Sequence, residues 1–246
     1  MKDRDKVIHP PHPATSILIQ QDMDLAALSD EQIKNHPPLM PSDWQLSRMA
    51  FVKKMMPGDF WKNKTLLELG ACDGTIGNMF SELGAIVTCV EGKDAYVRFI
   101  KNKHPHLNVL QADCDTDKWV FGKYDIIVNF GLLYHLENNH EAFLTNCIKN
   151  CACLFLESVI YDSPNNELYY REEMGAGQGL SGKAGTPTTS FVETILQKNN
   201  ALFTKYSDPS LNAGGHNYSW PDCNSGFDCA RRRFWIVNCS PQNTTK

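Results

Sequence analysis

The chain reads Leu66-Leu67-Glu68-Leu69-Gly70-Ala71-Cys72-Asp73-Gly74-Thr75-Ile76-Gly77 where its structural signal is strongest. The apolar residues at the start of this segment predict a short strand, and the glycines that follow predict a tight turn. The turn opens a helix, whose first N–H groups are unpaired and carry positive potential. A strand, a glycine-rich turn and a helix in this order predict an α/β fold that binds a ligand at the turn.

Strands and helices alternate along the rest of the chain. Strands are predicted at Thr65–Leu69, Ala85–Glu91, Leu107–Gln111, Tyr124–Phe130, Ala152–Ile160, Ala201–Tyr206 and Arg232–Cys239. Helices are predicted at Ser42–Met56, Thr75–Leu83, Asp94–Lys103, Asn138–Asn150 and Thr188–Asn199. Repeated β-α-β units with short turns predict a doubly wound, mostly parallel sheet with helices on both faces.

Three segments lack this alternation. Residues 1–40 are rich in Pro, His and Asp, and we expect a partly extended arm with one short helix around Asp24–Asn35. Residues 41–246 form the main domain. Within it, Asp162–Pro187 and Ser207–Ala230 read as irregular loops. Because both follow late strands of the sheet, we expect them at its carboxyl edge, where ligands of such folds bind.

Composition narrows the classes of function. The 246 residues are 42% apolar, which is enough for a sizeable core, and their formal charge of −4 does not favour a sequence-blind nucleic-acid binder. The sequence contains no apolar run long enough to span a membrane, and we expect no secretory signal, because residues 1–16 lack an apolar core followed by a small-residue cleavage site. Nine cysteines, several inside apolar runs, favour a reducing compartment over a disulfide scaffold. We therefore expect a cytoplasmic protein with no membrane partner.

Acidic residues lie at the ends of three successive strands. Glu68 is the last residue but one of the first strand, Glu91 ends the second, and Asp113 follows the third. A carboxylate at the end of the second strand can accept both hydroxyls of a ribose, and one after the third can accept an adenine amine. Glu68 would repel a pyrophosphate but suits an ammonium group, and Cys72 replaces the first glycine of the dinucleotide pattern. The charges therefore favour S-adenosylmethionine, and an NAD(P)-dependent oxidoreductase is the alternative.

The motifs ELGACDG, VEG, QAD and DIIVNFGLLYHL together resemble those of the class I S-adenosylmethionine-dependent methyltransferases. The resemblance implies a Rossmann-like seven-stranded sheet of order 3-2-1-4-5-7-6 with the last strand antiparallel. It also implies that the cofactor-binding residues are Glu68, Gly70, Gly74, Glu91, Asp113 and Asn129, with their neighbours Ala71, Gly92 and Cys114. The family more often has glycine where this chain has Cys72, and we expect that departure to cost little. More loosely, the downstream part resembles methyltransferases of glycan or small-metabolite pathways.

Methyl transfer to a hydroxyl needs an aligned nucleophile and a base that takes its proton. His135 follows the fourth strand and is the candidate general base, although a structural His is an alternative. Tyr134 beside it, and His216 and Tyr218 in the GGHNYSWPD segment, are the candidate substrate-binding residues, the alternative being core or strand-edge packing. We expect no metal site, because the late cysteines form no C-x-x-C pair.

Several charged residues have two possible roles. Arg48 lies on the helix before the first strand and either reaches the cofactor carboxylate or is exposed to solvent. Glu157 and Asp162, near the end of the fifth strand, either bind substrate hydroxyls or are solvated. The basic cluster at residues 231–233 opens a strand, for which a solvated end is the default expectation.

The sequence argues against DNA as a substrate. The D/N-P-P-Y/F motif of base-amine methyltransferases is absent, because the corresponding site reads Asn129-Phe130-Gly131-Leu132, and no Pro-Cys nucleophile occurs. The sequence therefore predicts methyl transfer to a small-molecule or sugar acceptor, with oxygen favoured. A non-catalytic binding module is the third hypothesis. The identity of the acceptor and the oligomeric state do not follow from the sequence.

Overall fold

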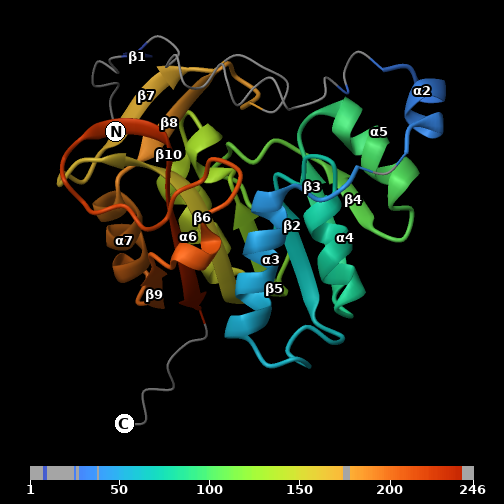
Figure 1. Ribbon diagram of the computed structural model, residues 1–246, viewed down its shortest axis with the longest axis horizontal. Helices are drawn as coiled ribbons and strands as arrows, with labels where there is room; N and C mark the ends of the chain where they lie inside the picture. Colours follow the sequence, from blue (N-terminus) through green and yellow to red (C-terminus); the bar gives the residue numbers. More distant parts are fainter. Residues whose placement is uncertain (1–7, 10–24, 26–27, 38, 174–177, 240–246) are drawn as a thin grey trace.

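A computed structural model describes residues 8–9, 25, 28–37, 39–173 and 178–239. Its main sheet has seven strands in the order β4-β3-β2-β5-β6-β10-β9 (Figure 1). The strands, in that spatial order, are β4 (Asn108–Gln111), β3 (Ile86–Glu91), β2 (Thr65–Leu69), β5 (Tyr124–Phe130), β6 (Cys151–Asp162), β10 (Gly226–Asn238) and β9 (Leu202–Tyr206). In chain order this is 3-2-1-4-5-7-6, and β10 pairs antiparallel with both neighbours, so the predicted fold is confirmed.

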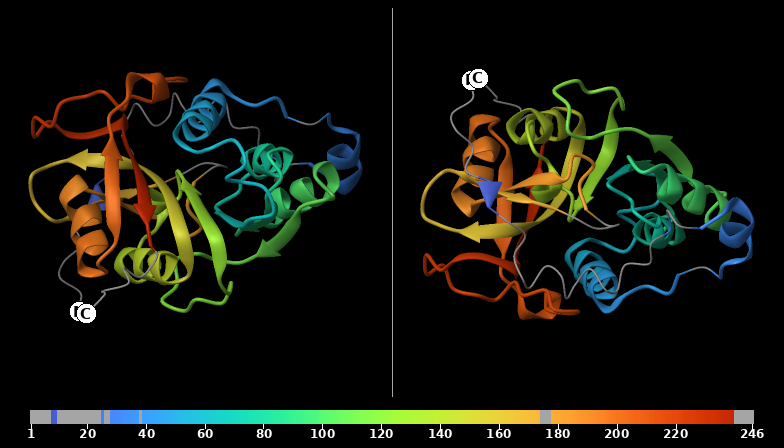
Figure 2. Two further views of the ribbon diagram at one scale, coloured as in Figure 1. Left: turned by 90° about the horizontal axis from the view of Figure 1, so that it is seen from below. Right: turned by 90° about the horizontal axis from the view of Figure 1, so that it is seen from above.

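Helices cover both faces of this sheet (Figure 2). The helices of the main domain are α3 (Asp43–Met55), α4 (Thr75–Glu82), α5 (Asp94–Lys103), α6 (His140–Lys149) and α7 (Thr189–Lys198). One core forms between the sheet and α6 and α7, and another forms between the opposite face and α3 and α4. Because successive side chains of a strand point to opposite faces, Leu66 packs in the second core while Leu67 and Leu69 pack in the first.

The segment Asp162–Pro187 differs from the loop that the sequence predicted. It contains β7 (Leu168–Glu172) and β8 (Lys183–Pro187), which pair antiparallel, and β1 (Ile8–His9) adds to β7 in parallel. This small second sheet lies above the carboxyl edge of the main sheet (Figure 1). Its strands are short and polar, and one partner strand comes from the start of the chain, so local patterning gave little sign of them.

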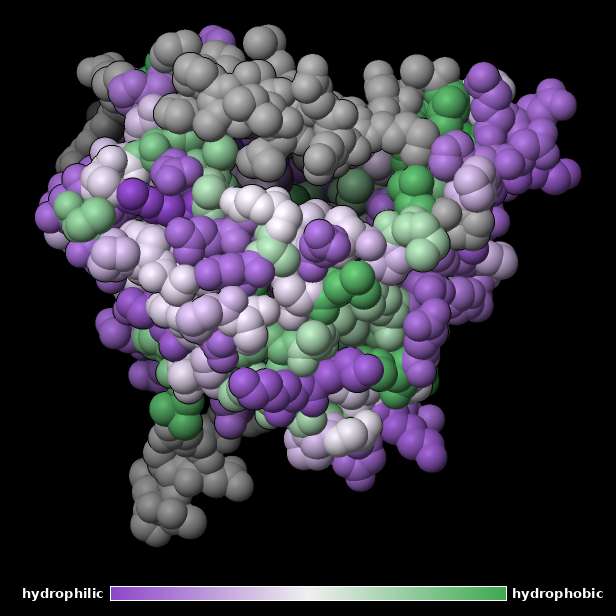
Figure 3. Space-filling model, viewed as in Figure 1, coloured by the Kyte–Doolittle hydropathy of each residue, from purple (hydrophilic) through white to green (hydrophobic). Residues whose placement is uncertain are grey.

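The short helix of the arm is α2 (Asp30–Asn35), which starts later than predicted because Ser29 caps it. Ser29 and Gln32 form a reciprocal capping box. Its one buried residue, Ile33, packs with Leu25 against α5, and its other side is exposed and hydrophilic (upper right in Figure 3). The HPPHP segment of the arm lies outside the described residues.

The last strand, β10, begins at Gly226, six positions before the predicted Arg232. Its register against β6 shifts between Phe227 and Arg232, so an irregular stretch separates its two parts. The remaining short elements are the 3₁₀ turns η2 (Leu133–His135) and η3 (Pro209–Leu211). Within the described part of the chain, no helix has the length and apolar character that crossing a membrane requires.

Candidate active site

A cavity of about 480 Å³ opens at the carboxyl edge of the main sheet. Its wall comes from α3, from the turns after β2, β3, β4 and β5, from the β7–β8 hairpin, from residues 214–216 and from β10. This volume lies in the range of small-molecule sites, and the position is the one expected for ligands of a parallel α/β sheet. The predicted cofactor and substrate segments therefore share one cavity.

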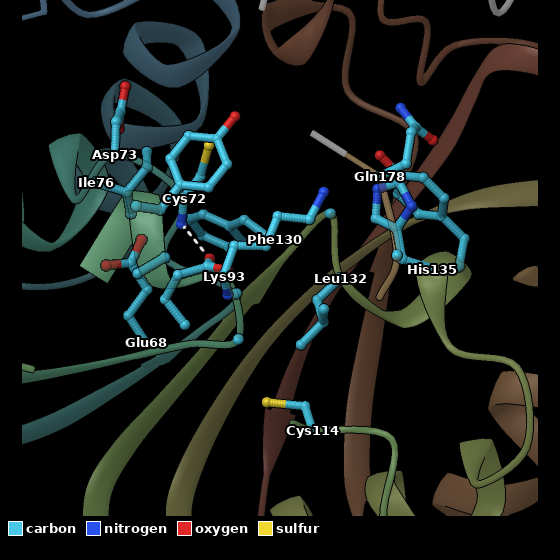
Figure 4. Close-up of a pocket in the computed structure, with 18 of the residues that line it drawn as sticks. Glu68, Cys72, Asp73, Ile76, Lys93, Cys114, Phe130, Leu132, His135 and Gln178 are labelled. Atoms are coloured by element: carbon cyan, nitrogen blue, oxygen red, sulfur yellow. Dashed lines mark hydrogen bonds between the residues drawn. The ribbon is translucent and has the colours of Figure 1, made fainter. Parts of the chain in front are cut away.

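Charge is unevenly distributed over the cavity wall. One end, which we call the acidic end, carries Glu68, Asp73, Glu91 and Asp113, together with Lys93. The other, which we call the arginine end, carries Arg48, Arg171 and Arg232, together with His135 and His216. Figure 4 shows Glu68 and Asp73 on one side and His135 on the other, with Phe130 and Leu132 between them. A ligand that spans the cavity meets opposite potentials at its two ends.

The turn after β2 has a strained backbone. Gly70 has φ 73°, and the N–H groups of Gly70 and Ala71 both donate to the carbonyl of Val90. Cys72 has φ 52°, a left-handed conformation that costs a residue with a side chain roughly 1–2 kcal/mol. The expectation that Cys72 costs little was therefore wrong, because the position itself suits glycine.

Two further glycines serve packing. Gly74 does not line the cavity, and a Cβ there would lie 3.0 Å from the side chain of Ile100. A Cβ at Gly77 would lie 2.6 Å from Oε2 of Glu68 and 2.7 Å from Sγ of Cys89. Gly74 thus allows the turn to pack against α5, and Gly77 allows α4 to approach the carboxyl group of Glu68.

Glu68 is a buried acid on the cavity wall without a basic partner among the described residues. The thiol of Cys89 donates to its Oε2 at 3.3 Å. Burial raises the pKa of Glu68 to about 8, so that its carboxyl group is mostly protonated at neutral pH. A cation beside Glu68 would favour the ionised form, which makes this position suited to an ammonium group.

Glu91 and Asp113 are fixed by the backbone near them. The N–H of Cys72 donates to Oε2 of Glu91 at 2.8 Å, and that of Lys93 donates to Oε1 at 2.9 Å. Burial raises the pKa of Glu91, while these hydrogen bonds oppose the shift. Asp113 is exposed, and its Oδ1 accepts from the N–H of Asp115 at 2.8 Å. Both residues line the cavity, and so do Gly92 and Cys114, which directly follow them in the chain.

Asn129 lies behind the cavity wall. It is fully buried, its Oδ1 accepts from the N–H of Leu132 at 3.3 Å, and its Nδ2 has no hydrogen-bond partner among the described residues. Asn129 therefore shapes the turn after β5, where the sequence had suggested a cofactor contact. Asp115, which sequence reasoning missed, accepts from the N–H groups of three consecutive residues, 137–139, and so anchors the segment after His135.

His135 pairs with an acid that the sequence analysis did not identify. Its Nδ1 lies 2.7 Å from Oε2 of Glu173, and the N–H of Gly179 donates to the same oxygen at 3.0 Å. Burial alone would raise the pKa of Glu173, but His135 and Arg171 outweigh it and lower that pKa overall. An ionised Glu173 accepts a hydrogen bond from the N–H at Nδ1, so the neutral imidazole keeps its basic lone pair on Nε2.

Tyr134 lies between two arginines. The guanidinium of Arg232 is 5.2 Å from the centre of its ring, and that of Arg171 is 6.0 Å away. Its hydroxyl accepts from Nη2 of Arg232 at 3.3 Å, and its ring lies 4.0 Å from the ring of His135. Tyr134 thus joins the candidate base to the arginines of β7 and β10.

Three charged residues that we expected in solvent are buried together. Arg48 is 1% exposed, Arg232 5%, and Glu157 between them 0%. Glu157 Oε1 lies 3.0 Å from Nη2 of Arg48 and 3.0 Å from Nη1 of Arg232. The solvated roles considered for these residues are therefore wrong. The burial of each residue depends on ion-pair partners that are distant in the sequence, and the local sequence pattern does not indicate such partners.

The GGHNYSWPD segment supports the same cluster. Tyr218 is fully buried and does not line the cavity; its hydroxyl accepts from Nε of Arg48 at 3.0 Å and donates to Glu157 at 3.1 Å. His216 does line the cavity, and its Nδ1 accepts from Nη2 of Arg48 at 3.4 Å. Burial, and then the charges of Arg232 and Arg48, lower the pKa of His216 strongly, so that the ring stays neutral.

Asp162 lies outside the cavity wall and holds a loop together. Its Oδ2 accepts from the hydroxyl and the N–H of Ser225, at 2.6 and 2.8 Å, and from Nη1 of Arg231 at 3.0 Å. This role replaces the substrate contact considered from the sequence. No group of three or more metal-ligating side chains occurs among the residues that the structure describes.

No protein-family model and no curated protein matches the chain. Solved structures do match it. The N-terminal domain of EvdMO1 with SAH bound is 16% identical, with a TM-score of 0.58, over 81% of this chain and 82% of that one. A S-adenosylmethionine-dependent methyltransferase from Mesorhizobium loti is 9% identical, with a TM-score of 0.55, over 78% and 97%. The DhpI-SAM-HEP complex is 13% identical, with a TM-score of 0.52, over 78% and 85%.

These likenesses agree with the strand order of the main sheet. The chain therefore has the fold of the class I S-adenosylmethionine-dependent methyltransferases.

Proposed function

We propose that the protein transfers a methyl group from S-adenosylmethionine to a small-molecule acceptor, with oxygen as the favoured acceptor atom. The observation that carries the proposal is the arrangement of Glu68, Glu91 and Asp113 along one end of one cavity. Glu91 and Asp113 suit the ribose hydroxyls and the adenine amine, and Glu68 suits the ammonium group of the cofactor.

The protonation of Glu68 distinguishes binding of S-adenosylmethionine from binding of a dinucleotide. A buried carboxyl group with a pKa of about 8 is uncharged in the empty site at neutral pH, and it ionises at little cost when an ammonium group approaches. The same group cannot favour a pyrophosphate, which needs positive potential and bare backbone. Cys72, whose side chain occupies the middle of the turn, also opposes close approach of a pyrophosphate.

His135 serves as the general base in this proposal. Its Nε2 takes the proton of the acceptor hydroxyl while the acceptor oxygen attacks the methyl carbon. The bond between methyl carbon and sulfur breaks, its electron pair remains on sulfur, and S-adenosylhomocysteine leaves. Glu173 holds the tautomer that exposes Nε2 and stabilises the positive charge that forms on the ring, as the third group of a triad does.

Calorimetric titration of the purified protein with S-adenosylmethionine, S-adenosylhomocysteine and NADH tests the proposal. We expect the two adenosyl ligands to bind and NADH to give no heat. Glu91→Ala should lower the affinity for S-adenosylhomocysteine by roughly tenfold or more, because two ribose hydrogen bonds to a charged group are lost. Gly58→Ala is the matched control, since a Cβ there meets nothing within 4 Å. Binding of NADH without the adenosyl ligands would overturn the proposal.

A further inference from the structure

The arginine end of the cavity holds more positive charge than its acids balance. Outside Arg48 and Arg232, each described arginine has an acid that no other arginine contacts. These pairs are Arg98 with Asp30 and Asp94, Arg171 with Glu173, Arg231 with Asp162 and Asp228, and Arg233 with Asp222. Arg48 and Arg232 share Glu157. The one place with an uncompensated buried arginine, among the described residues, is therefore on the cavity wall.

An excess charge in this place is costly. Arg48, Arg232 and Glu157 are all buried, so water screens their charges little, and a buried cation without a counter-ion is strongly destabilising. The acid of Glu157 already accepts from both arginines and from Tyr218. A ligand that brings one negative charge would remove this cost, whereas a neutral or cationic ligand would not.

The uncharged groups beside the two arginines are hydrogen-bond donors toward the cavity. The hydroxyl oxygen of Tyr134 accepts from Arg232, which leaves its proton for another acceptor. Nδ1 of His216 accepts from Arg48, which donates only, so the neutral ring carries its proton on Nε2. Both side chains line the cavity. Donors of this kind, with two guanidinium groups, match the acceptor oxygens of an anion.

Gly131 leaves space on the cavity wall in front of Arg232 and Tyr134. A Cβ at this position would lie 3.7 Å from Oε2 of Glu157, 3.7 Å from the hydroxyl of Tyr134 and 3.9 Å from Nη1 of Arg232. Gly131 lines the cavity and carries no side chain, so nothing of its own fills the space before the arginine and the tyrosine.

We propose that Arg48 and Arg232, with Tyr134 and His216, bind an anionic group of the methyl acceptor, so that the substrate is a small carboxylic acid or phosphate ester. This inference rests on the proposed methyltransferase function. The acceptor is the favoured source of the anion because the ring of Tyr134, which contacts Arg232, lies 4.0 Å from the ring of the candidate base His135. The carboxylate of the cofactor is the other source with the same chemistry, and the experiment separates the two.

The first measurement uses the protein saturated with S-adenosylhomocysteine. It is titrated with benzoate, inorganic phosphate and neutral benzamide at constant ionic strength, and binding is followed by calorimetry and by thermal shift. We expect one of the two anions to bind at least about tenfold more tightly than benzamide. If neither anion binds more tightly than benzamide, the proposal is overturned.

Variants then locate the anion. Arg232→Met leaves one arginine for Glu157 and removes the excess charge, so we expect anion binding to fall by about tenfold or more. Arg48→Met also leaves one arginine for Glu157, and this variant is used if Arg232→Met does not fold. Arg98→Met is the matched control, because Arg98 is an ion-paired arginine away from the cavity, and it should bind as the unmodified protein does. Undiminished anion binding in the charge-balanced variants would contradict the proposal.

The last comparison tests whether the anionic group bound by the arginines is the carboxylate of the cofactor. S-adenosylhomocysteine and its decarboxylated analogue, which keeps the amine, are titrated into the unmodified protein and Arg232→Met. We expect the variant to change neither affinity by more than about twofold. A loss confined to S-adenosylhomocysteine would assign the excess charge to the cofactor carboxylate and overturn the acceptor proposal. Failure of the unmodified protein to bind S-adenosylhomocysteine would overturn the proposed function instead.

Discussion

Nδ1 of His135 lies 2.7 Å from Oε2 of Glu173, although the two residues are 38 positions apart. His135 belongs to η2 after β5, and Glu173 directly follows β7 of the second sheet. Glu173 is itself held by Arg171 and by the N–H of Gly179. The second sheet therefore holds the acid that pairs with Nδ1 of His135.

This pair predicts a separation of turnover from cofactor binding. Measured with any small molecule that the protein methylates on oxygen, His135→Ala should lower kcat by about 10²–10⁴-fold, because the proton of the acceptor loses its base. Glu173→Gln should lower kcat by about tenfold or more, because an amide no longer stabilises the imidazolium. Neither should change the affinity for S-adenosylhomocysteine by more than about twofold in calorimetry. Unchanged kcat in both variants would remove the pair from the catalytic machinery.

Glu68→Gln should stabilise the empty protein while weakening cofactor binding. The pKa of Glu68 is about 8 in the folded protein and near 4.5 when unfolded, so the folded state alone binds this proton between those pH values. Its contribution to the free energy of unfolding therefore falls by up to about 1.4 kcal/mol per pH unit as pH rises. The melting temperature of the variant, relative to the unmodified protein, should thus increase between pH 5 and pH 8.

The same variant should bind S-adenosylhomocysteine about tenfold more weakly, because an amide cannot balance the ammonium charge. Differential scanning fluorimetry and calorimetry measure the two effects. A melting-temperature difference that is constant with pH would show that Glu68 is not protonated in the folded state.

Cys72→Gly should raise stability. Glycine adopts the left-handed backbone at this position without the strain of a side chain, a gain of up to about 1 kcal/mol, reduced by the lost packing of the thiol. Cys72→Val should destabilise, since a β-branched residue fits φ 52° worse. Urea unfolding of the three proteins measures the order; a glycine variant less stable than the valine variant would refute the strain argument.

Gly77→Ala should damage both stability and the acidic end of the cavity. A Cβ at Gly77 would press on the carboxyl of Glu68 and the thiol of Cys89, at 2.6 and 2.7 Å. Overpacking of this kind lowers the free energy of unfolding by about 1–3 kcal/mol. Displacement of the Glu68 carboxyl group should also lower the affinity for S-adenosylhomocysteine. Gly58→Ala, with no neighbour in contact, is the control and should unfold at nearly the same urea concentration. Equal behaviour of the two variants would contradict the packing described here.

The positions of the main strands followed from the sequence because buried parallel strands are continuous apolar runs, as in Tyr124–Phe130. Their order in the sheet was implied by the resemblance to the class I methyltransferases, because apolar runs locate strands without ordering them. The acidic end of the cavity followed from the pattern, since Glu68 and Glu91 lie at the carboxyl ends of such runs and these ends meet at one edge.

The arginine end of the cavity could not be predicted from the sequence. Arg48 and Arg232 look like surface residues in the sequence, and their burial depends on Glu157, which is 75 positions from Arg232. The β7–β8 hairpin was missed for a related reason, because its pairing is decided by tertiary contacts with short polar strands. Tyr218 and Asn129 were expected at ligands, but the structure uses their polar groups to satisfy buried neighbours.

The central claim is that an adenosyl cofactor lies across the ends of β2, β3 and β4, and a crystal structure with S-adenosylhomocysteine tests it most directly. The claim predicts ribose hydroxyls within hydrogen-bond distance of Glu91, the adenine amine near Asp113 and the amino group beside Glu68. Density for the ligand at another place, or this cavity filled by the polypeptide itself, would contradict it.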